Sequence, residues 1–312
     1  MTTPVKLGVF GLALAAVFAA ALAVGSAIGP VSAADRAHRG TAHGDQADMA
    51  GMAGMDHPGT TGPAVHGLAD GARPQGLAVS ADGFTIVPTG AGLAAGQPGT
   101  FSFRITGPDG NAVTAFTTVH DKQLHLVVVR RDLAGYQHVH PAQAPDATWS
   151  VALTLPAPGA YKAFADFQPA GHAEKTLAVD LLAAGAFVPE PLAAPAAISA
   201  VDGYQVALSG QLVAGRGSAL TFSVSKDGRP VTDLQPCLAA YGHLVALRVG
   251  DLAYLHVHPG GVPGDGHTPA GPQVTLHADV PTAGVYRLFL EFKAGDTVHT
   301  AEFTAVADKG AP

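Results

Sequence analysis

From about residue 80 onward, apolar and polar residues alternate in short runs along the chain. The runs "TFSFRIT" (100–106), "WSVALTLP" (149–156) and "AYKAFADF" (160–167) are typical, and Gly, Pro and Asp turns separate them. Alternation with a period of two places every second side chain on one face of a β-strand. About seven such runs in about 100 residues are typical of an immunoglobulin-like sandwich, so the sequence predicts an all-β fold.

The pattern occurs twice, which indicates an internal repeat. The segment "LHLVVVRRDLAGYQHVHP" (124–141) corresponds to "GHLVALRVGDLAYLHVHP" (242–259), and "YKAFADF" (161–167) corresponds to "YRLFLEF" (286–292). The numbering differs by 118 in the first pair and by 125 in the second, so a loop in "GGVPGDGHTPAG" (260–271) accounts for seven extra residues. We expect one β-sandwich over residues 77–188, a stiff Pro/Ala linker over 189–197, and a second sandwich over 198–308.

The amino-terminal part predicts export. Residues 1–34 include an uncharged stretch from Leu7 to Ile28, and these 22 residues are long enough to span the hydrocarbon core of about 30 Å. Small residues in "PVSAAD" (30–35) also suit a signal peptidase. We expect a single-pass anchor in the cytoplasmic membrane with extracytoplasmic domains, and secretion after cleavage is the alternative. Residues 35–76, rich in Gly, Ala, Asp and His, predict a flexible tether.

Composition excludes several classes of protein. A net charge of −7 and only 13% charged residues provide no basic surface for nucleic acid. The single cysteine, Cys237, allows no intramolecular disulfide, and we interpret it as a small buried hydrophobe rather than a metal thiolate. Neither repeat contains a nucleotide-binding motif or a nucleophile elbow. A cluster of three histidines with an open position can activate water, but no well-placed general base accompanies it besides Asp166 or Glu291, so we expect no enzyme activity.

Histidines at matched positions are the candidate chemistry. "DLAG" (132–135) predicts a hairpin turn that places His125 opposite His140 or Pro141, with His138 on the same face as His140. Directly opposed Cβ atoms lie about 5 Å apart, so these imidazoles can reach one ion. The second repeat offers an equivalent trio, and a structural histidine network is the alternative for both. The six predicted metal ligands are His125, His138, His140, His243, His256 and His258.

Two further groups bear on this hypothesis. The tether carries methionines at three-residue spacing, flanked by histidines. Thioethers favour Cu(I), whereas imidazoles bind Cu(II) or Zn. The tether is therefore either a metal-loading arm or low-complexity sequence. Its candidate ligands are Met49, Met52, Met55, His43 and His57. Asp166 and Glu291 are acids at equivalent places in aromatic strands, where each either orients a ligand histidine or faces solvent.

The segments His-Leu-x-Val-Val, Asp-Leu, His-x-His-Pro and "YKAFADF" resemble those of exported bacterial proteins, common in actinobacteria, that are related to YtkA-like and heavy-metal-binding-domain proteins. The resemblance covers about residues 80–306 and is strong in these segments only. It implies an immunoglobulin-like or cupredoxin-like sandwich and a role in metal handling, often of copper. The chain lacks the type 1 copper pattern around Cys237, which argues against blue-copper electron transfer.

The sequence therefore predicts a non-enzymatic, exported metal-binding protein that buffers or delivers copper, with zinc as the alternative ion. Its expected partners are the metal ion, the membrane and a protein that takes part in metal transfer. The alternative function is an adhesion or scaffold module of two tandem immunoglobulin-like domains with structural histidines.

Overall fold

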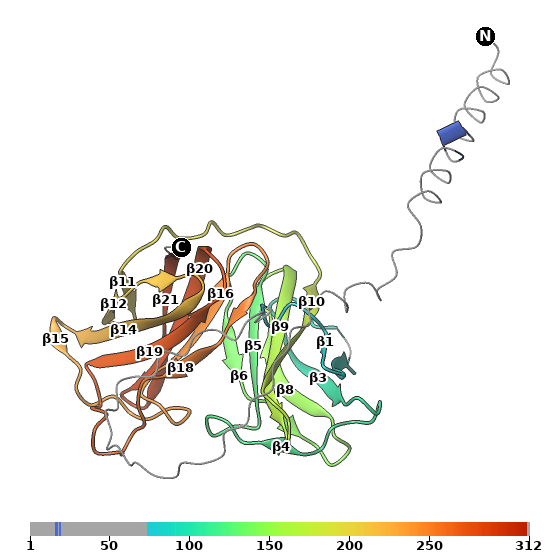
Figure 1. The fold of residues 1–312 in the computed structure, drawn as a ribbon, viewed down its shortest axis with the longest axis horizontal. Coiled ribbons are helices and arrows are strands. Elements are labelled where there is room, and N and C mark those ends of the chain that lie inside the picture. The colour runs from blue at the N-terminus through green and yellow to red at the C-terminus, as the bar shows by residue number, and fades with distance from the viewer. Residues whose placement is uncertain (1–15, 18, 20–73, 91, 311–312) are drawn as a thin grey trace, which may run out of the picture. The chain divides into compact units, whose positions relative to one another are not determined.

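The computed structural model describes residues 16, 17, 19, 74–90 and 92–310, and Figure 1 shows their fold. The chain divides into two units, Met1–Thr61 and Gly62–Pro312, and both repeats belong to the second. Among the described residues, no helix is long and apolar enough to cross a membrane. The predicted membrane segment and tether lie outside these residues, apart from Ala16, Val17, Ala19 and residues 74–76.

The first repeat consists of two antiparallel sheets in the orders β1-β2-β3-β8-β7 and β10-β9-β5-β6, with β4 paired to β9. The strands are β1 (Ser80–Ala81), β2 (Phe84–Pro88), β3 (Pro98–Thr106), β4 (Phe116–Thr117), β5 (Leu124–Arg130), β6 (Gln137–Val139), β7 (Ala142–Gln143), β8 (Trp149–Thr154), β9 (Gly159–Pro169) and β10 (Lys175–Ala183).

The second repeat has the sheets β11-β12-β14-β19-β18, with β15 paired to β14, and β13-β21-β20-β16-β17, in which β13 and β21 run parallel. The strands are β11 (Ile198–Val201), β12 (Tyr204–Ser209), β13 (Leu212–Val213), β14 (Arg216–Lys226), β15 (Arg229–Pro230), β16 (His243–Arg248), β17 (Tyr254–Leu255), β18 (Val257–Pro259), β19 (Gln273–Val280), β20 (Gly284–Ala294) and β21 (Thr297–Asp308). The predicted all-β fold of two tandem immunoglobulin-like sandwiches is confirmed.

Alternation of side chains builds one core in each repeat. In β3, Phe101, Phe103 and Ile105 face inward, and they pack with Trp149 of β8. Phe222 of β14 and Phe303 of β21 have the same role in the second repeat, where their rings lie 5.5 Å apart. Burial of these large apolar side chains is the main term that stabilises each sandwich.

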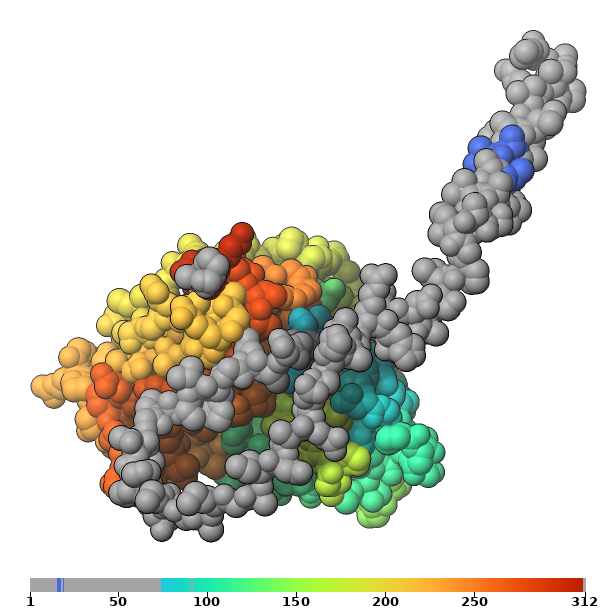
Figure 2. All heavy atoms as spheres, viewed as in Figure 1, coloured from blue at the N-terminus to red at the C-terminus, as the bar shows by residue number. Residues whose placement is uncertain are grey.

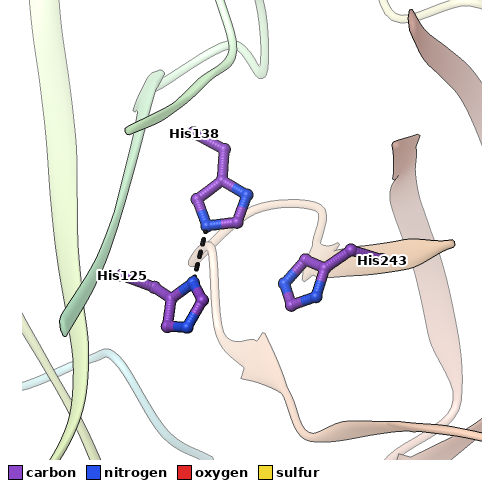
Figure 3. A group of neighbouring side chains, drawn as sticks. All are labelled: His125, His138 and His243. Carbon is purple, nitrogen blue, oxygen red and sulfur yellow. Dashed lines mark hydrogen bonds between the residues drawn. The ribbon is translucent and has the colours of Figure 1, made fainter. Parts of the chain in front are cut away.

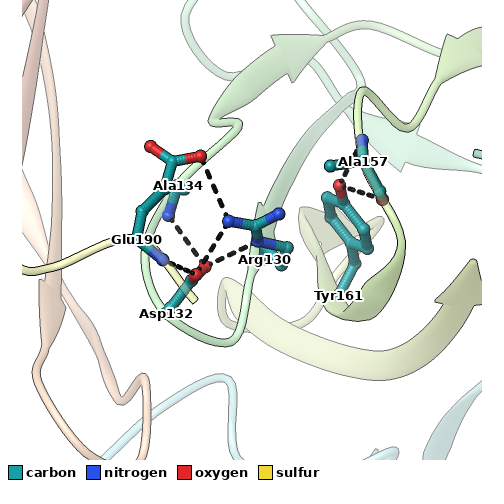
Figure 4. A network of polar contacts seen from close by, with 6 residues as sticks. All are labelled: Arg130, Asp132, Ala134, Ala157, Tyr161 and Glu190. Atoms are coloured by element: carbon teal, nitrogen blue, oxygen red, sulfur yellow. Dashed lines mark hydrogen bonds and ion pairs between the residues drawn. The ribbon is translucent and has the colours of Figure 1, made fainter. Parts of the chain in front are cut away.

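A tyrosine fixes the same corner in both repeats. The Tyr161 hydroxyl donates to the carbonyl of Ala157 at 2.7 Å, as Figure 4 shows, and the Tyr286 hydroxyl donates to the carbonyl of Thr282 at 2.8 Å. A tyrosine that bonds back to the backbone a few residues upstream is a hallmark of immunoglobulin-like sandwiches. The corner therefore supports the fold class and the alignment of the repeats.

The turn after β5 anchors the start of the interdomain linker. Arg130 donates two hydrogen bonds of 2.8 Å to the Asp132 carboxylate and pairs with Glu190 at 3.1 Å, and the Glu190 amide donates to Asp132 (Figure 4). The bidentate geometry of Arg130 and Asp132 makes this the stronger part of the network. The linker therefore leaves the first repeat in a fixed direction.

The two repeats share an apolar cluster between β5 and β9 on one side and β16 and β20 on the other. All seven residues of β5 are buried, because one face covers its own core and the other face contacts the second repeat. The ring of Tyr136 stacks on that of Phe289 at 4.1 Å between centroids. Figure 2 shows the first repeat in cyan to green and the second in yellow to red. The cluster consists of Val127, Val129, Leu133, Phe164, Ala178, Val245, Leu247, Leu252, Tyr254 and Phe289.

Phe289→Ala is expected to lower the free energy of unfolding by about 3–5 kcal/mol, because it removes a fully buried ring from this cluster. Urea denaturation followed by circular dichroism measures the change. Leu182→Ala is the control, since Leu182 is 73% exposed, and it is expected to change stability by about 0.5 kcal/mol or less. Equal stability of the two variants would contradict the shared cluster.

Candidate metal centre

The hairpin of β5 and β6 positions the first histidine trio. Leu126 pairs with Val139 and Val127 with His138, and this register places His125 opposite His140. Because directly opposed residues share a face, His138 lies on the face of Val127, which is the face toward the second repeat. His125 also lies on this face, since it is two residues from Val127.

Three imidazoles from both repeats meet at this face (Figure 3). The group consists of His125, His138 and His243, and each offers one ring nitrogen within 4.8 Å of the others. His125 Nδ1 lies 3.1 Å from His138 Nε2 and 3.3 Å from His140 Nε2. Ligand nitrogens about 2.0–2.1 Å from a tetrahedral ion are about 3.4 Å apart, so these separations suit metal coordination.

Hydrogen bonds fix the tautomers of two of these rings. His125 Nε2 lies 3.1 Å from the carbonyl oxygen of Val119, and His138 Nδ1 lies 2.7 Å from Glu291 Oε2. A carbonyl and a carboxylate only accept, so both nitrogens carry the proton and donate it. In neutral rings, lone pairs therefore remain on His125 Nδ1 and His138 Nε2, which face each other. A cation between or beside them, either a proton or a metal ion, relieves the repulsion.

The site favours neutral imidazole. Burial lowers the pKa of His125 to about 4 and that of His140 to about 3. Burial also holds the pKa of His243 well below its ordinary value. Neutral imidazole is the form that binds metal ions, so the lone pairs of these three rings are available near neutral pH.

Glu291 reaches the first trio from the second repeat. It is 8% exposed, and besides the bond from His138 it accepts a hydrogen bond of 3.4 Å from the Tyr136 hydroxyl. A carboxylate that accepts from the second nitrogen of a ligand histidine fixes the ring and raises its basicity. Glu291 thus lies in the position predicted for an orienting acid, but its histidine belongs to the other repeat.

The second trio does not reproduce the first. After the turn, the chain pairs with β16 only over the two residues of β17 (Tyr254–Leu255). It then crosses to the other sheet as β18, in which His258 pairs with His277 of β19. His256 and His258 therefore do not join His243 in the close group with His125 and His138, although all three second-repeat histidines line one cavity of about 100 Å³. The rings of His256 and His258 lie 4.3 Å apart in a T-shaped arrangement. The two trios therefore do not have the equivalent geometry that we expected. Only His243 of the second trio joins the group of His125 and His138.

The remaining predicted residues do not belong to this group of histidines. Asp166 accepts a hydrogen bond of 3.0 Å from Thr176 and, among the described residues, has no hydrogen-bonded histidine. Cys237 is half-buried, and burial raises the pKa of its thiol, which disfavours a thiolate ligand. The tether ligands Met49, Met52, Met55, His43 and His57 lie outside the described residues.

Sequence reasoning missed two residues beside this site, His120 and Glu174. Both line a cavity of about 100 Å³ next to His125 and His243. His120 matches Leu238 in the second repeat, so a search for repeated histidines cannot find it. A signal was nevertheless present, because His120 and Asp121 form a polar pair between two strand runs, which is typical of a tight turn.

Fold and site together define a tandem immunoglobulin-like protein with a histidine cluster between its sandwiches. The chain belongs to the family described as "Domain of unknown function (DUF8832)", which matches residues 79–184 and again residues 199–309. No curated protein matches the chain.

Solved structures of surface proteins are similar to the chain at low scores. The Escherichia coli adhesin FdeC has 17% identity and a TM-score of 0.24, with coverage of 75% of this chain and 66% of that structure. Invasin, a bacterial integrin-binding protein, has 15% identity, a TM-score of 0.21 and coverage of 71% and 39%. Domains 4–9 of the surface layer protein SbsC have 14% identity, a TM-score of 0.23 and coverage of 73% and 31%.

The chain spans 66% or less of the length of these three structures. Their names describe an adhesin, an integrin-binding protein and a surface layer protein. At these identities and scores, however, the likeness concerns the fold, and no function follows from it.

Asp166→Asn is expected to change how stability depends on pH in the metal-free protein. Burial raises the pKa of Asp166 from 3.8 to about 7, so ionisation destabilises the folded state. The contribution of the neutral Asp166 carboxyl to the stability of the wild type is fully present below pH 4 and is lost as pH rises towards 7. At about 1.4 kcal/mol per pKa unit, discounted for partial exposure, the variant gains about 2 kcal/mol relative to wild type between pH 5 and pH 8.

Urea unfolding at both pH values measures this difference. Asp180→Asn is the control, because the Asp180 side chain is 62% exposed. A difference between Asp166→Asn and wild type that is the same at pH 5 and pH 8 would contradict the raised pKa.

Proposed function

We propose that the protein binds a metal ion between its two sandwiches through His125, His138 and His243, with His140 beside them. The observation that carries this proposal is the 3.1 Å separation of His125 Nδ1 and His138 Nε2, two ring nitrogens that face each other while the opposite nitrogen of each ring faces an oxygen acceptor. A metal ion that accepts both lone pairs replaces their repulsion with two bonds. The carboxylate of Glu291 then orients His138 and balances part of the charge of the ion.

The donor set favours a borderline ion. Imidazole suits copper and zinc, whereas Ca²⁺ and Mg²⁺ prefer oxygen ligands. Copper is our first choice, because the tether adds methionine and histidine ligands that suit both of its oxidation states, and zinc is the alternative. We propose storage or transfer of the ion rather than catalysis.

We place this function outside the cytoplasm. The support is the apolar segment from Leu7 to Ile28, which suits an anchor in the cell membrane or a secretion signal. A protein on the outer side of the membrane can bind metal ions before they enter the cytoplasm. The proposal is therefore a non-enzymatic protein that buffers an ion or delivers it to a protein partner.

A second candidate is an adhesion or scaffold module in which the histidines are structural. The observation that favours it is the apolar cluster that joins the two immunoglobulin-like modules. The two candidates differ in their response to metal. If the protein is a scaffold, His125→Ala lowers the melting temperature by the same amount with and without metal. If the protein binds metal, metal raises the melting temperature of the wild type but not that of His125→Ala.

Calorimetric titration of the metal-stripped protein with Cu²⁺ and Zn²⁺ is expected to show one equivalent fewer for His138→Ala than for wild type. The variant loses one ligand and the link to Glu291. His267→Ala is the control, because His267 is exposed in another loop. All three proteins keep residues 35–76, so ligands in the tether contribute equally. Identical isotherms for His138→Ala and the control would overturn the proposal.

Glu291→Gln is expected to weaken the affinity of this site about 10- to 100-fold, because glutamine still accepts a hydrogen bond from His138 but provides no negative charge. Competition with a chelator of known affinity measures the dissociation constant. Glu302→Gln is the matched control, since Glu302 is exposed and pairs with Arg287 in the neighbouring strand. An unchanged affinity in Glu291→Gln would show that the carboxylate does not support a ligand.

A further inference from the structure

Contacts between the two repeats occur in reciprocal pairs. Tyr136 of the first repeat stacks on Phe289 of the second, and the matching Tyr254 of the second lies 5.6 Å from Phe164 of the first. Val127 and Val245, which also match, both belong to the shared cluster. Such reciprocity is the mark of an interface with approximate two-fold symmetry. His125 and His243 match each other and stack at 5.7 Å, so the symmetry axis passes near them.

The same symmetry assigns a counterpart to the first site. His138 matches His256, and Glu291 matches Asp166, so His256 and Asp166 should lie together on the other side of the axis. Both residues line the cavity of about 100 Å³ that His125 and His243 also border. His138 and Glu291, which belong to the first site, do not line it. The structure therefore has a second cluster of ionisable side chains beside the first site.

Glu174 supplies a carboxylate to this second cluster. Its Oε2 lies 4.0 Å from His256 Nε2, which is too far for a hydrogen bond. The two side chains are 31% and 29% exposed, so they can move towards a common ion and exchange it with solvent. Asp166 lines the same cavity as Glu174.

His120 approaches from a strained turn. Val119 and Lys122 bridge across the turn, and His120 and Asp121 have φ values of 48° and 62°. The matching turn bridges Cys237 and Ala240 and has Leu238 and Ala239 at φ values of 55° and 59°, so the backbone shape is common to both repeats. The ring of His120 lies 5.7 Å from that of His243 and lines the cavity.

We propose that this cavity is a second metal site, in which His120, His256 and Glu174 bind one divalent ion of the zinc or copper type. Two imidazoles and one carboxylate form a donor set that such ions accept, with room for water or a transferred group as a further ligand. This inference rests on the proposed function and extends it, because it assigns two unequal sites to one interface.

The test is zinc titration of the full-length chain in detergent, with Zn²⁺ itself as the probe. Glu174→Gln is expected to lose one equivalent, or to bind it at least tenfold more weakly, and to retain the equivalent that His138→Ala loses. Glu190→Gln is the matched control, because Glu190 is 69% exposed in the linker and does not line the cavity. His120→Asn gives an independent variant, since asparagine tolerates the left-handed turn but removes the imidazole. Circular dichroism confirms that each variant is folded.

The outcomes separate the two proposals. If His138→Ala loses an equivalent but Glu174→Gln and His120→Asn match Glu190→Gln, the second site is wrong and the first site stands. If Glu174→Gln and His120→Asn each lose an equivalent that His138→Ala retains, the second site is supported. If no variant differs from wild type, both sites are wrong.

Discussion

The apolar contact between the two sandwiches is the interaction on which the candidate chemistry depends. Each sandwich has its own core, but the histidines of interest come from β5 and β6 in the first and from β16 in the second. They meet because valines, leucines and aromatic rings on the same two sheets pack together. Separated sandwiches would leave His125 without His243 and His138 without Glu291. The hydrophobic effect therefore assembles the polar site, and polar contacts refine it.

Much of the fold and part of the site could be predicted from the sequence. Period-two alternation predicts the strands, and the repeat predicts two sandwiches, because both signals are local or recur along the chain. The turn after β5 also fixes the relation of His125 to His140. The position of His243 could not be predicted in this way, because it depends on how two folded modules dock. One available signal was the unbroken apolar run in β5, which indicates that both faces of the strand are covered.

The second trio shows why a repeated motif does not guarantee repeated geometry. The sequence HVHP is identical in both copies, but the first copy extends β6 to Val139 whereas the second leaves β16 after Leu255. When the chain crosses to the other sheet at a different residue, the same side chains contact different neighbours. His258 consequently lies opposite His277 on an exposed surface. Matched spacing identified the correct hairpin, and the pairing of each strand determined which imidazoles meet.

The linker that begins at Glu190 has a consequence for assembly. A reciprocal interface of this kind is also what two separate copies of one sandwich would form as a symmetric dimer. Joining the copies in one chain makes docking intramolecular, so the partner sandwich is present at an effective concentration of about millimolar whatever the abundance of the protein. It also allows the two repeats to differ in sequence at matching positions. Leu238 can occupy the place of His120, and Asp166 that of Glu291, without the change appearing twice.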